Sequence, residues 1–242
     1  MNALSGKTYW LIGASEGLGR ALAIELAKAG ARLCLSARNE DRLQALASEL
    51  PEGTVVAPLD LRDSGSVAEA FKTLPAIDGL IFSAGLYDPM PADAWDADAA
   101  EAMADVNFTG AIRVLGHAMP ALVKRGEGHI VLIGSVAGLT GLPKAIGYGA
   151  SKAAVIHLAE NLRADLDPQR FKVQVINPGF IETRLTEKND FKMPFIMSAE
   201  EAARRTRRIM ESGKFRGYFP RRFAMLFQIG RLLPDWLYFR IV

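Results

Sequence analysis

The first third of the chain alternates short apolar runs with helical patterns, and this alternation constrains the fold more than any other feature. Apolar runs at 9–14, 31–37, 54–59 and 77–82 are candidate strands, and the segments 18–29, 40–50 and 64–74 between them have helical periodicity. Strands that alternate with helices of this length pair in parallel, with helices on both faces of the sheet. We therefore predict an α/β fold built on a doubly wound parallel sheet.

A glycine-rich turn connects the first candidate strand to the first candidate helix. Gly13, Gly17 and Gly19 form the pattern G-x-x-x-G-x-G at this point. Glycines allow a tight turn and let a pyrophosphate approach the backbone, and the free N–H groups at the start of the helix then face the anion. A structural turn that binds nothing is the alternative, but the strand–turn–helix context favours a dinucleotide site.

Residues at the ends of the next two strands indicate which dinucleotide binds. Arg38 follows the second strand, about twenty residues beyond the turn, where an acid would bind the ribose of NAD and a cation suits a 2′-phosphate. We therefore predict NADP(H), with NAD(H) as the alternative. Glu16 lies inside the turn, and we expect its carboxylate to point to solvent, away from that phosphate. Asp60 ends the third strand, where its carboxylate would meet the adenine amino group.

Tyr148 and Lys152 are candidates for proton transfer. They lie four residues apart in a helical pattern that begins near residue 145, so both side chains project from one face of the helix. A nearby cation favours the phenolate and lowers the pKa of a tyrosine, which would let Tyr148 exchange a proton with a substrate oxygen. An exposed aromatic residue beside an exposed lysine is the alternative interpretation of the same spacing.

Two polar residues upstream are candidates for the same site. Ser135 follows the strand predicted at 129–133, at the end of the sheet where substrates bind; a serine that caps a turn is the alternative. Asn107 lies in an apolar part of a long helix predicted over 97–124, with a kink at Pro120. An amide in such surroundings indicates a buried hydrogen-bonding role.

These motifs, together with Ser83-Ala84-Gly85 and Asn177-Pro178-Gly179, resemble the short-chain dehydrogenases/reductases in order and spacing over roughly the first 185 residues. The resemblance implies a Rossmann-type sheet and hydride transfer between a nicotinamide and a carbonyl/alcohol pair. The sequence departs from the family pattern at Ile12, where threonine is usual, and at Phe82-Ser83, where the family has two asparagines.

The resemblance also implies roles for individual residues. Ser135 would donate a hydrogen bond to the substrate oxygen and Tyr148 would transfer the proton. Lys152 would lower the pKa of the tyrosine and hold the nicotinamide ribose, and Asn107 would support a water in a proton relay. Thr183 would meet the nicotinamide carboxamide. The implied cofactor-binding residues are Gly13, Ser15, Gly17, Leu18, Gly19, Arg38, Asp60, Leu61, Ser83, Ala84, Gly85, Tyr148, Lys152, Pro178, Gly179, Ile181 and Thr183.

Composition restricts the other classes of function. The 242 residues are half hydrophobic, which suffices for one domain over 1–242, and no uninterrupted run of about 18 apolar residues suggests a spanning helix. The single cysteine, Cys34, is expected in a buried strand of a cytoplasmic protein. A net charge of +2 argues against nucleic-acid binding. The histidines lack metal-ligand spacing, so we predict no metal; we expect His157 to face away from the site and His117 to lie at a subunit contact.

The last third of the chain contains two further apolar segments. Residues 180–197 contain phenylalanines and methionines, and we predict a lid that forms an apolar wall around the substrate; ordinary loop packing is the alternative. Ser198 and Glu201 form a capping box for a helix that ends at Gly213. Ten lysines and arginines but only two acidic residues follow residue 201. The apolar and basic segment 221–242, in which we place Phe223 and Leu226 on one stripe, would pack on another subunit, cover the cleft or lie on an anionic membrane surface.

These observations lead to one expected function and one alternative. We expect an NADP(H)-dependent oxidoreductase that acts on an apolar carbonyl or alcohol, assembled as a homodimer or homotetramer as the resemblance implies. The alternative is a regulator that senses NADP without turnover, although such a sensor has no need of a Ser135, Tyr148 and Lys152 set. The related epimerases are disfavoured because they need a larger second domain.

Overall fold

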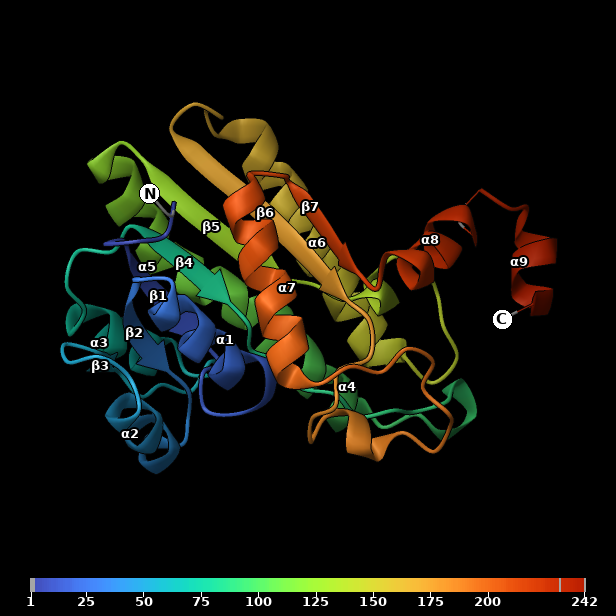
Figure 1. The fold of residues 1–242 in the computed structure, drawn as a ribbon. Helices are drawn as coiled ribbons and strands as arrows, with labels where there is room; N and C mark the ends of the chain where they lie inside the picture. The colour runs from blue at the N-terminus through green and yellow to red at the C-terminus, as the bar shows by residue number, and fades with distance from the viewer. Residues whose placement is uncertain (1–2, 231, 242) are drawn as a thin grey trace.

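The computed structural model describes residues 3–230 and 232–241, and within them seven parallel strands form one sheet in the order β3-β2-β1-β4-β5-β6-β7 (Figure 1). The chain moves outward from β1 to β3 and then returns to place β4 beside β1, so the carboxyl ends of β1 and β4 are neighbours at a topological switch point. This arrangement confirms the doubly wound sheet. The strands are β1 (Thr8–Ile12), β2 (Arg32–Ser36), β3 (Val55–Val56), β4 (Gly79–Phe82), β5 (Gly128–Ile133), β6 (Phe171–Pro178) and β7 (Arg216–Phe219).

Helices cover both faces of the sheet, as expected. One face is covered by α1 (Gly17–Lys28), α2 (Glu40–Ser48) and α7 (Ala199–Ser212). The other face is covered by α3 (Ser64–Lys72), α5 (Gly110–Arg125) and α6 (Ile146–Asp165), and α4 (Ala97–Ala104) packs against α6 through Met103. Two short helices, α8 (Arg221–Gly230) and α9 (Asp235–Ile241), extend beyond β7 at one end of the molecule (Figure 1). The serine half of the capping box is confirmed, because Ser198 Oγ accepts a hydrogen bond from the backbone N–H of Glu201, whereas the Glu201 carboxylate pairs with Arg204 and Arg205. Gly213 ends α7 with a φ of 72°.

The long helix predicted over 97–124 is interrupted. A π-helical turn, Asp105–Thr109, separates α4 from α5, whereas α5 runs through Pro120 to Arg125. The interruption therefore lies upstream of Pro120, and the kink at Pro120 stays a prediction. A π turn inserts one extra residue into a helix and is frequent at functional sites. Here it contains Asn107, whose side chain is completely buried.

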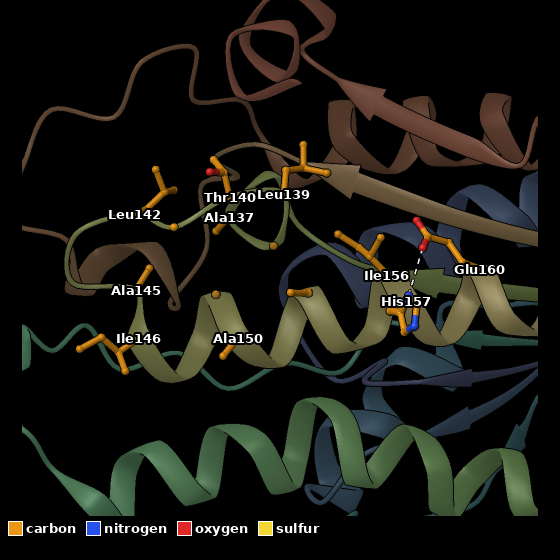
Figure 2. A pocket seen from close by; sticks show the side chains of 14 residues that line it. Ala137, Leu139, Thr140, Leu142, Ala145, Ile146, Ala150, Ile156, His157 and Glu160 are labelled. Carbon is orange, nitrogen blue, oxygen red and sulfur yellow. Dashed lines mark hydrogen bonds and ion pairs between the residues drawn. The ribbon is translucent and has the colours of Figure 1, made fainter. Parts of the chain in front are cut away.

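The outer face of α6 borders a groove of about 560 Å³ (Figure 2). The loop around Leu139 and Leu142 forms one wall, and small residues such as Ala150 form the floor on α6. His157 lies at the far end, exposed and paired with Glu160 at 3.2 Å between Nδ1 and Oε2. His157 therefore faces away from Tyr148, as predicted. The ring of His117 stacks on Phe71 in the same chain, with centroids 5.7 Å apart, and its place at a subunit contact stays a prediction.

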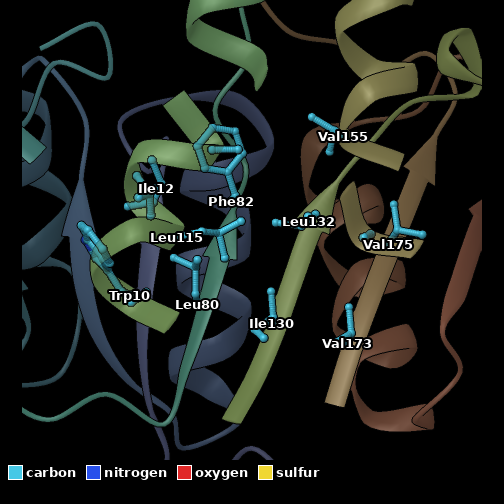
Figure 3. Close-up of a cluster of buried hydrophobic side chains, with 14 of the residues drawn as sticks. Trp10, Ile12, Leu80, Phe82, Leu115, Ile130, Leu132, Val155, Val173 and Val175 are labelled. Carbon is cyan, nitrogen blue, oxygen red and sulfur yellow. The ribbon is translucent and has the colours of Figure 1, made fainter. Parts of the chain in front are cut away.

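Alternating strand residues build a hydrophobic core on each face of the sheet. Trp10, Leu80 and Ile130 point toward α3, α5 and α6 (Figure 3), while the intervening Tyr9 and Ile81 point toward α1 and α7. This alternation follows the two-residue repeat of a strand. The indole N–H of Trp10 donates to Ser36 Oγ at 2.9 Å, so its single polar group is satisfied inside the core. Cys34 is buried in β2, as predicted.

A buried polar network closes the amino end of the sheet, opposite the switch point. The ring of His129 lies 2.8 Å from Tyr9 OH through Nδ1 and 2.8 Å from Gln174 Oε1 through Nε2. The amide N–H₂ of Gln174 donates to the carbonyls of Ile209 and Lys214, so its oxygen faces the histidine and Nε2 must carry the proton. Burial is the main cause that lowers the pKa of His129 to about 4; the charge of Lys172 adds to this shift and the bond to Gln174 opposes it.

We expect this histidine to make the fold sensitive to moderate acid. Its folded pKa lies below the unfolded value near 6.5, so the neutral ring stabilises the fold above pH 6.5 and that stability is lost as pH falls toward 4. Urea unfolding should show a loss of about 2 kcal/mol between pH 7 and pH 5. The variant His129→Gln has no titrating ring and should lose much less over the same interval. An equal loss in both proteins would assign the acid sensitivity to other groups.

Candidate active site

The predicted site residues meet at the carboxyl ends of four adjacent strands. The glycine turn follows β1, the segment 83–85 follows β4, Ser135 follows β5, and Gly179 follows β6. The polar residues of the expected proton-transfer set thus lie along the same edge of the sheet as the switch point. This is the edge at which open α/β sheets bind their ligands.

The glycine turn is too tight for side chains. Gly13 and Gly17 have φ values of 85° and 54°, which favour glycine over other residues. A Cβ atom added to Gly13 would lie 2.6 Å from the backbone nitrogen of Ala84, and one added to Gly19 would lie 1.9 Å from the carbonyl oxygen of Gly13. Ser15 and Leu18 are part of the same turn and the first turn of α1. The resulting backbone cradle at a helix N-terminus fits the pyrophosphate of a dinucleotide.

Tyr148, Ser135 and Lys152 come together next to this turn. The Lys152 ammonium lies 5.8 Å from the centroid of the Tyr148 ring and donates a hydrogen bond of 2.9 Å to the carbonyl of Ile133 at the end of β5. Ser135 forms a side-chain hydrogen bond with Tyr148 and accepts another from the backbone N–H of Ala137. Two neighbouring elements therefore fix both side chains that flank the phenol.

The ionisation of this pair differs from the expectation. Burial raises the pKa of Tyr148 to about 12; the hydrogen bond with Ser135 opposes this shift, and Tyr87 adds to it. Burial lowers the pKa of Lys152 to about 8. The predicted lowering of the tyrosine pKa by lysine is therefore absent, because removal of the phenol from water dominates and Ser135, not Lys152, is the group that opposes it. The phenol is protonated at neutral pH.

Asn107 connects the π turn to the same site. Its Oδ1 accepts from the backbone N–H of Leu86 at 2.6 Å, and its Nδ2 donates to the carbonyl of Leu86 and to Ser151 Oγ, each at 2.9 Å. The hydroxyl of Ser151 in turn donates to the carbonyl of Tyr148 at 2.8 Å. A Cβ atom on Gly85 would lie 3.7 Å from the Lys152 ammonium and 3.9 Å from Asn107 Oδ1, so this glycine separates the two side chains.

The adenine end of the expected cofactor site is lined by Arg38 and Asp60. Arg38 is exposed just beyond β2, and its charge helps to lower the pKa of the Asp60 carboxyl, although the main cause is a hydrogen bond from Arg62. Arg62 reaches Asp60 through its guanidinium at 2.8 Å, so this carboxylate already has a partner. Leu61 is buried against Gly110.

Glu16 does not point freely to solvent, which corrects our expectation. One carboxylate oxygen lies 2.6 Å from Arg42 of α2 and the other lies 2.6 Å from Arg184 of the lid segment. The glycine turn, α2 and residues 180–197 are therefore connected through a single carboxylate. Three polar side chains from distant parts of the sequence meet here because the turn and the lid approach each other at the switch point.

The segment 180–197 covers this edge of the sheet and is fixed at several points. Thr183 lies against the glycine turn, since its methyl group would be 3.0 Å from a Cβ on Gly17. Tyr87 OH donates to Asn189 Oδ1 at 2.7 Å, and Lys144 pairs with Asp190 at 2.7 Å. The phenylalanines do not all face inward: Phe191 and Phe195 are about half exposed.

The residues after β4 and β6 complete the outline of the site. Ala84 is in contact with the glycine turn, and Ser83 Oγ is buried without a hydrogen-bond partner among the described residues. Pro178 ends β6, Gly179 packs against Phe223 of α8, and Ile181 is buried. An unpartnered buried hydroxyl beside the cradle is consistent with a polar ligand at this place.

Sequence reasoning missed Tyr87, Ser151, Arg42 and Arg184. The ring of Tyr87 meets that of Tyr148 edge-on with centroids 5.0 Å apart. No local pattern marks Tyr87, Arg42 or Arg184, because each reaches the site only through the folding of a loop or a neighbouring helix. Ser151 had a signal, since it lies between Tyr148 and Lys152 on α6. Among the described residues, no group of three or more His, Cys, Asp or Glu side chains is arranged to hold a metal ion.

Comparison with known proteins agrees with this geometry. A family model described as short chain dehydrogenase matches residues 7–193. An uncharacterized oxidoreductase of Myxococcus xanthus is 34% identical over 249 residues, which cover 98% of this chain and 97% of that protein. A short-chain dehydrogenase from Burkholderia cenocepacia, solved in complex with NADP, has a TM-score of 0.87 and 28% identity, covering 99% of this chain and 98% of that one.

A second solved structure extends this agreement. A short-chain dehydrogenase from Sphingobium yanoikuyae in complex with NADPH has a TM-score of 0.81 and 28% identity, covering 93% of this chain and 94% of that one. The family model spans well over half of the sequence, and the Myxococcus relative matches nearly its whole length. The chain therefore belongs to the short-chain dehydrogenase family of oxidoreductases.

Proposed function

We propose that the protein is an NADP(H)-dependent oxidoreductase that interconverts a carbonyl group and an alcohol on an apolar substrate, with Tyr148 as the general acid and base. The observation that carries this proposal is the meeting of Tyr148, Ser135 and Lys152 beside the glycine turn at the switch point. Oligomer formation, as a homodimer or homotetramer, is part of the proposal; exposed Ile112 on α5 and the groove along α6 offer apolar surface for it.

The chemistry follows from the groups at hand. When bound, NADPH supplies the hydride for the carbonyl carbon. The Ser135 hydroxyl donates a hydrogen bond to the carbonyl oxygen, and the neutral Tyr148 phenol transfers its proton to that oxygen as negative charge develops there. The Lys152 ammonium then stabilises the phenolate that remains. Asn107 holds Leu86 and Ser151, which fixes the loop and the helix on either side of the phenol.

The choice of NADP(H) is supported by the residues around the turn. Arg38 follows β2 at the position where an acidic residue would favour NAD, the residue before it is Ala37, and Arg42 lies on the next helix. The proteins from Burkholderia and Sphingobium were solved with NADP and NADPH. A lone buried cysteine is in keeping with a reducing compartment, so we place the protein in the cytoplasm.

Turnover and binding measurements test the proposed function directly. NADPH absorbance is followed with a panel of apolar ketones and aldehydes, and NADPH affinity is measured by calorimetry. Consumption of NADPH with at least one class of carbonyl is the expected result. Tight NADPH binding with no turnover across the panel would favour the sensor interpretation and contradict the proposed oxidoreductase activity.

A charge change at Glu16 tests the assignment of the 2′-phosphate site. We expect Glu16→Gln to tighten NADPH binding roughly fivefold and to leave NADH binding unchanged, because one negative charge near the phosphate is removed. The matched control is Glu49→Gln, which removes a carboxylate paired with Arg20 at 2.6 Å on the neighbouring surface. Weaker NADPH binding in Glu16→Gln alone would show instead that Glu16 positions Arg42 for the phosphate.

A further inference from the structure

We propose that α8 and α9 form a surface that docks on anionic lipid headgroups, so that the protein binds reversibly to the face of a membrane. This docking surface consists of the outward residues of the two helices, Arg221, Arg222, Met225, Leu226, Ile229, Trp236, Phe239 and Arg240. It lies at one end of the molecule, beyond the last strand of the sheet (Figure 1). The proposal does not depend on the proposed oxidoreductase activity.

One face of α8 packs against the body of the protein, and the opposite face is exposed. Phe223 and Phe227 face the body, where the Phe223 ring lies 5.7 Å from that of Phe180 and 4.9 Å from that of Phe227. Met225, Leu226 and Ile229 recur at helical spacing on the opposite face and are 50–64% exposed. Leu226 therefore does not share a stripe with Phe223, contrary to the sequence prediction. The inward face of α8 packs against the body of the protein. The apolar outward face is exposed and therefore available to bind a partner.

Helix α9 repeats this arrangement. Tyr238 is buried, its hydroxyl donates to the carbonyl of Gly141 at 2.8 Å, and its ring packs against Gly230 at the end of α8. Trp236 and Phe239 lie on the other side of the helix and are 71% and 69% exposed. Because Tyr238 holds α9 against the body, the Trp236 ring remains directed away from it, whereas the exposed Phe239 ring lies beside Gly141. Tryptophan and phenylalanine on the apolar face of a short helix are typical of interfacial helices.

The positive charge of this docking surface indicates that its partner is anionic. Residues 221–242 contain four arginines, and Asp235 is their only acidic residue. Arg221, Arg222 and Arg240 are exposed beside the apolar residues. An anionic lipid surface offers an apolar interior and negative headgroups together. A twofold contact between two copies of the chain would instead place the arginines of one copy against those of the other. This repulsion disfavours a second copy as the partner.

The surroundings fit a helix pair that lies on a membrane. No helix among the described residues is long and apolar enough to cross one. The lid contributes further exposed apolar residues next to α8, since the Phe195 ring lies 6.1 Å from that of Phe223. Docking through α8 and α9 would therefore bring the rim of the proposed substrate site close to the acyl boundary, from which apolar molecules could enter.

Flotation of the full chain with vesicles tests this inference. We expect the protein to float with vesicles of equal parts phosphatidylcholine and phosphatidylglycerol, and to float far less with phosphatidylcholine alone or in high salt. Two double variants, Leu226→Glu with Trp236→Glu and Arg221→Glu with Arg222→Glu, should each lower the bound fraction at least about tenfold. Thermal unfolding confirms that each variant is folded.

A matched control and a second measurement make the outcome decisive. Val123→Glu also replaces an exposed apolar residue, 56% exposed at the end of α5, and should leave flotation unchanged. Light scattering after gel filtration is run in parallel. If the wild type does not float, or if the double variants float as well as the wild type, the inference is wrong. Failure to float combined with loss of a dimer in the Leu226→Glu and Trp236→Glu variant would assign the surface to a second copy.

Discussion

Replacing Tyr148 with phenylalanine is expected to lower kcat by about 10²–10⁴ while leaving the affinity for NADPH within about twofold of the wild-type value. The substitution removes one oxygen and with it the proton that the substrate oxygen must receive. The ring remains in place, held edge-on by Tyr87 with centroids 5.0 Å apart. Steady-state kinetics with the best carbonyl of the panel gives kcat, and calorimetry gives the affinity for NADPH.

Tyr87→Phe is the matched control for this experiment. It removes a second phenol from the same ring pair, but that hydroxyl donates to Asn189 in the lid rather than to Ser135. We expect most of kcat to survive in this variant, with KM as the more sensitive quantity. A Tyr148→Phe protein that kept more than about a tenth of the wild-type kcat would remove Tyr148 from the proposed chemistry.

Replacing Gly19 with alanine is expected to weaken NADPH binding at least about a hundredfold, because the added methyl group collides with backbone rather than with a flexible side chain. The added Cβ would lie 1.9 Å from the carbonyl oxygen of Gly13 and 2.8 Å from its carbonyl carbon. The turn must therefore open, and the backbone N–H groups at the start of α1 lose their common direction. Calorimetric titration with NADPH measures the effect.

The control for this variant is Gly116→Ala on α5. A Cβ at Gly116 meets nothing within 4 Å, and alanine is the better helix former by about 1 kcal/mol. Gly116→Ala should therefore bind NADPH like the wild type and unfold at a slightly higher temperature. If Gly19→Ala remained folded and bound NADPH normally, the glycine turn would not be the pyrophosphate site.

The parts of this fold that could be predicted from sequence are those set by local patterns. The alternation between residues 9 and 82 gave parallel strands at the right places, and the spacing of Ser198, Glu201 and Gly213 gave both ends of α7. Strand β3 itself is short, Val55–Val56, but the backbone N–H groups of Ala57 and Leu59 donate to the carbonyls of Leu35 and Ala37, so pairing continues along most of the predicted run.

The remaining differences arise from tertiary contacts. The π turn at Asn107 gives no periodic signal, because one extra residue changes the phase of a helix without changing its composition. The partners of Glu16 lie 26 and 168 residues away, at Arg42 and Arg184, and no local rule brings them together. The high pKa of Tyr148 reflects desolvation, which depends on everything packed around the phenol and not on the spacing to Lys152.

The carboxylate of Glu16 joins the lid to the glycine turn through Arg184, and it holds Arg42 of α2 at the same time. If the dinucleotide binds at the glycine turn as we propose, these ion pairs lie next to it, and their separation would ease its departure. The rate of cofactor exchange would then depend on the strength of these ion pairs as well as on movement of the lid. These ion pairs are exposed to solvent, so dissolved salt screens them. The turnover rate of the proposed enzyme should therefore increase with ionic strength.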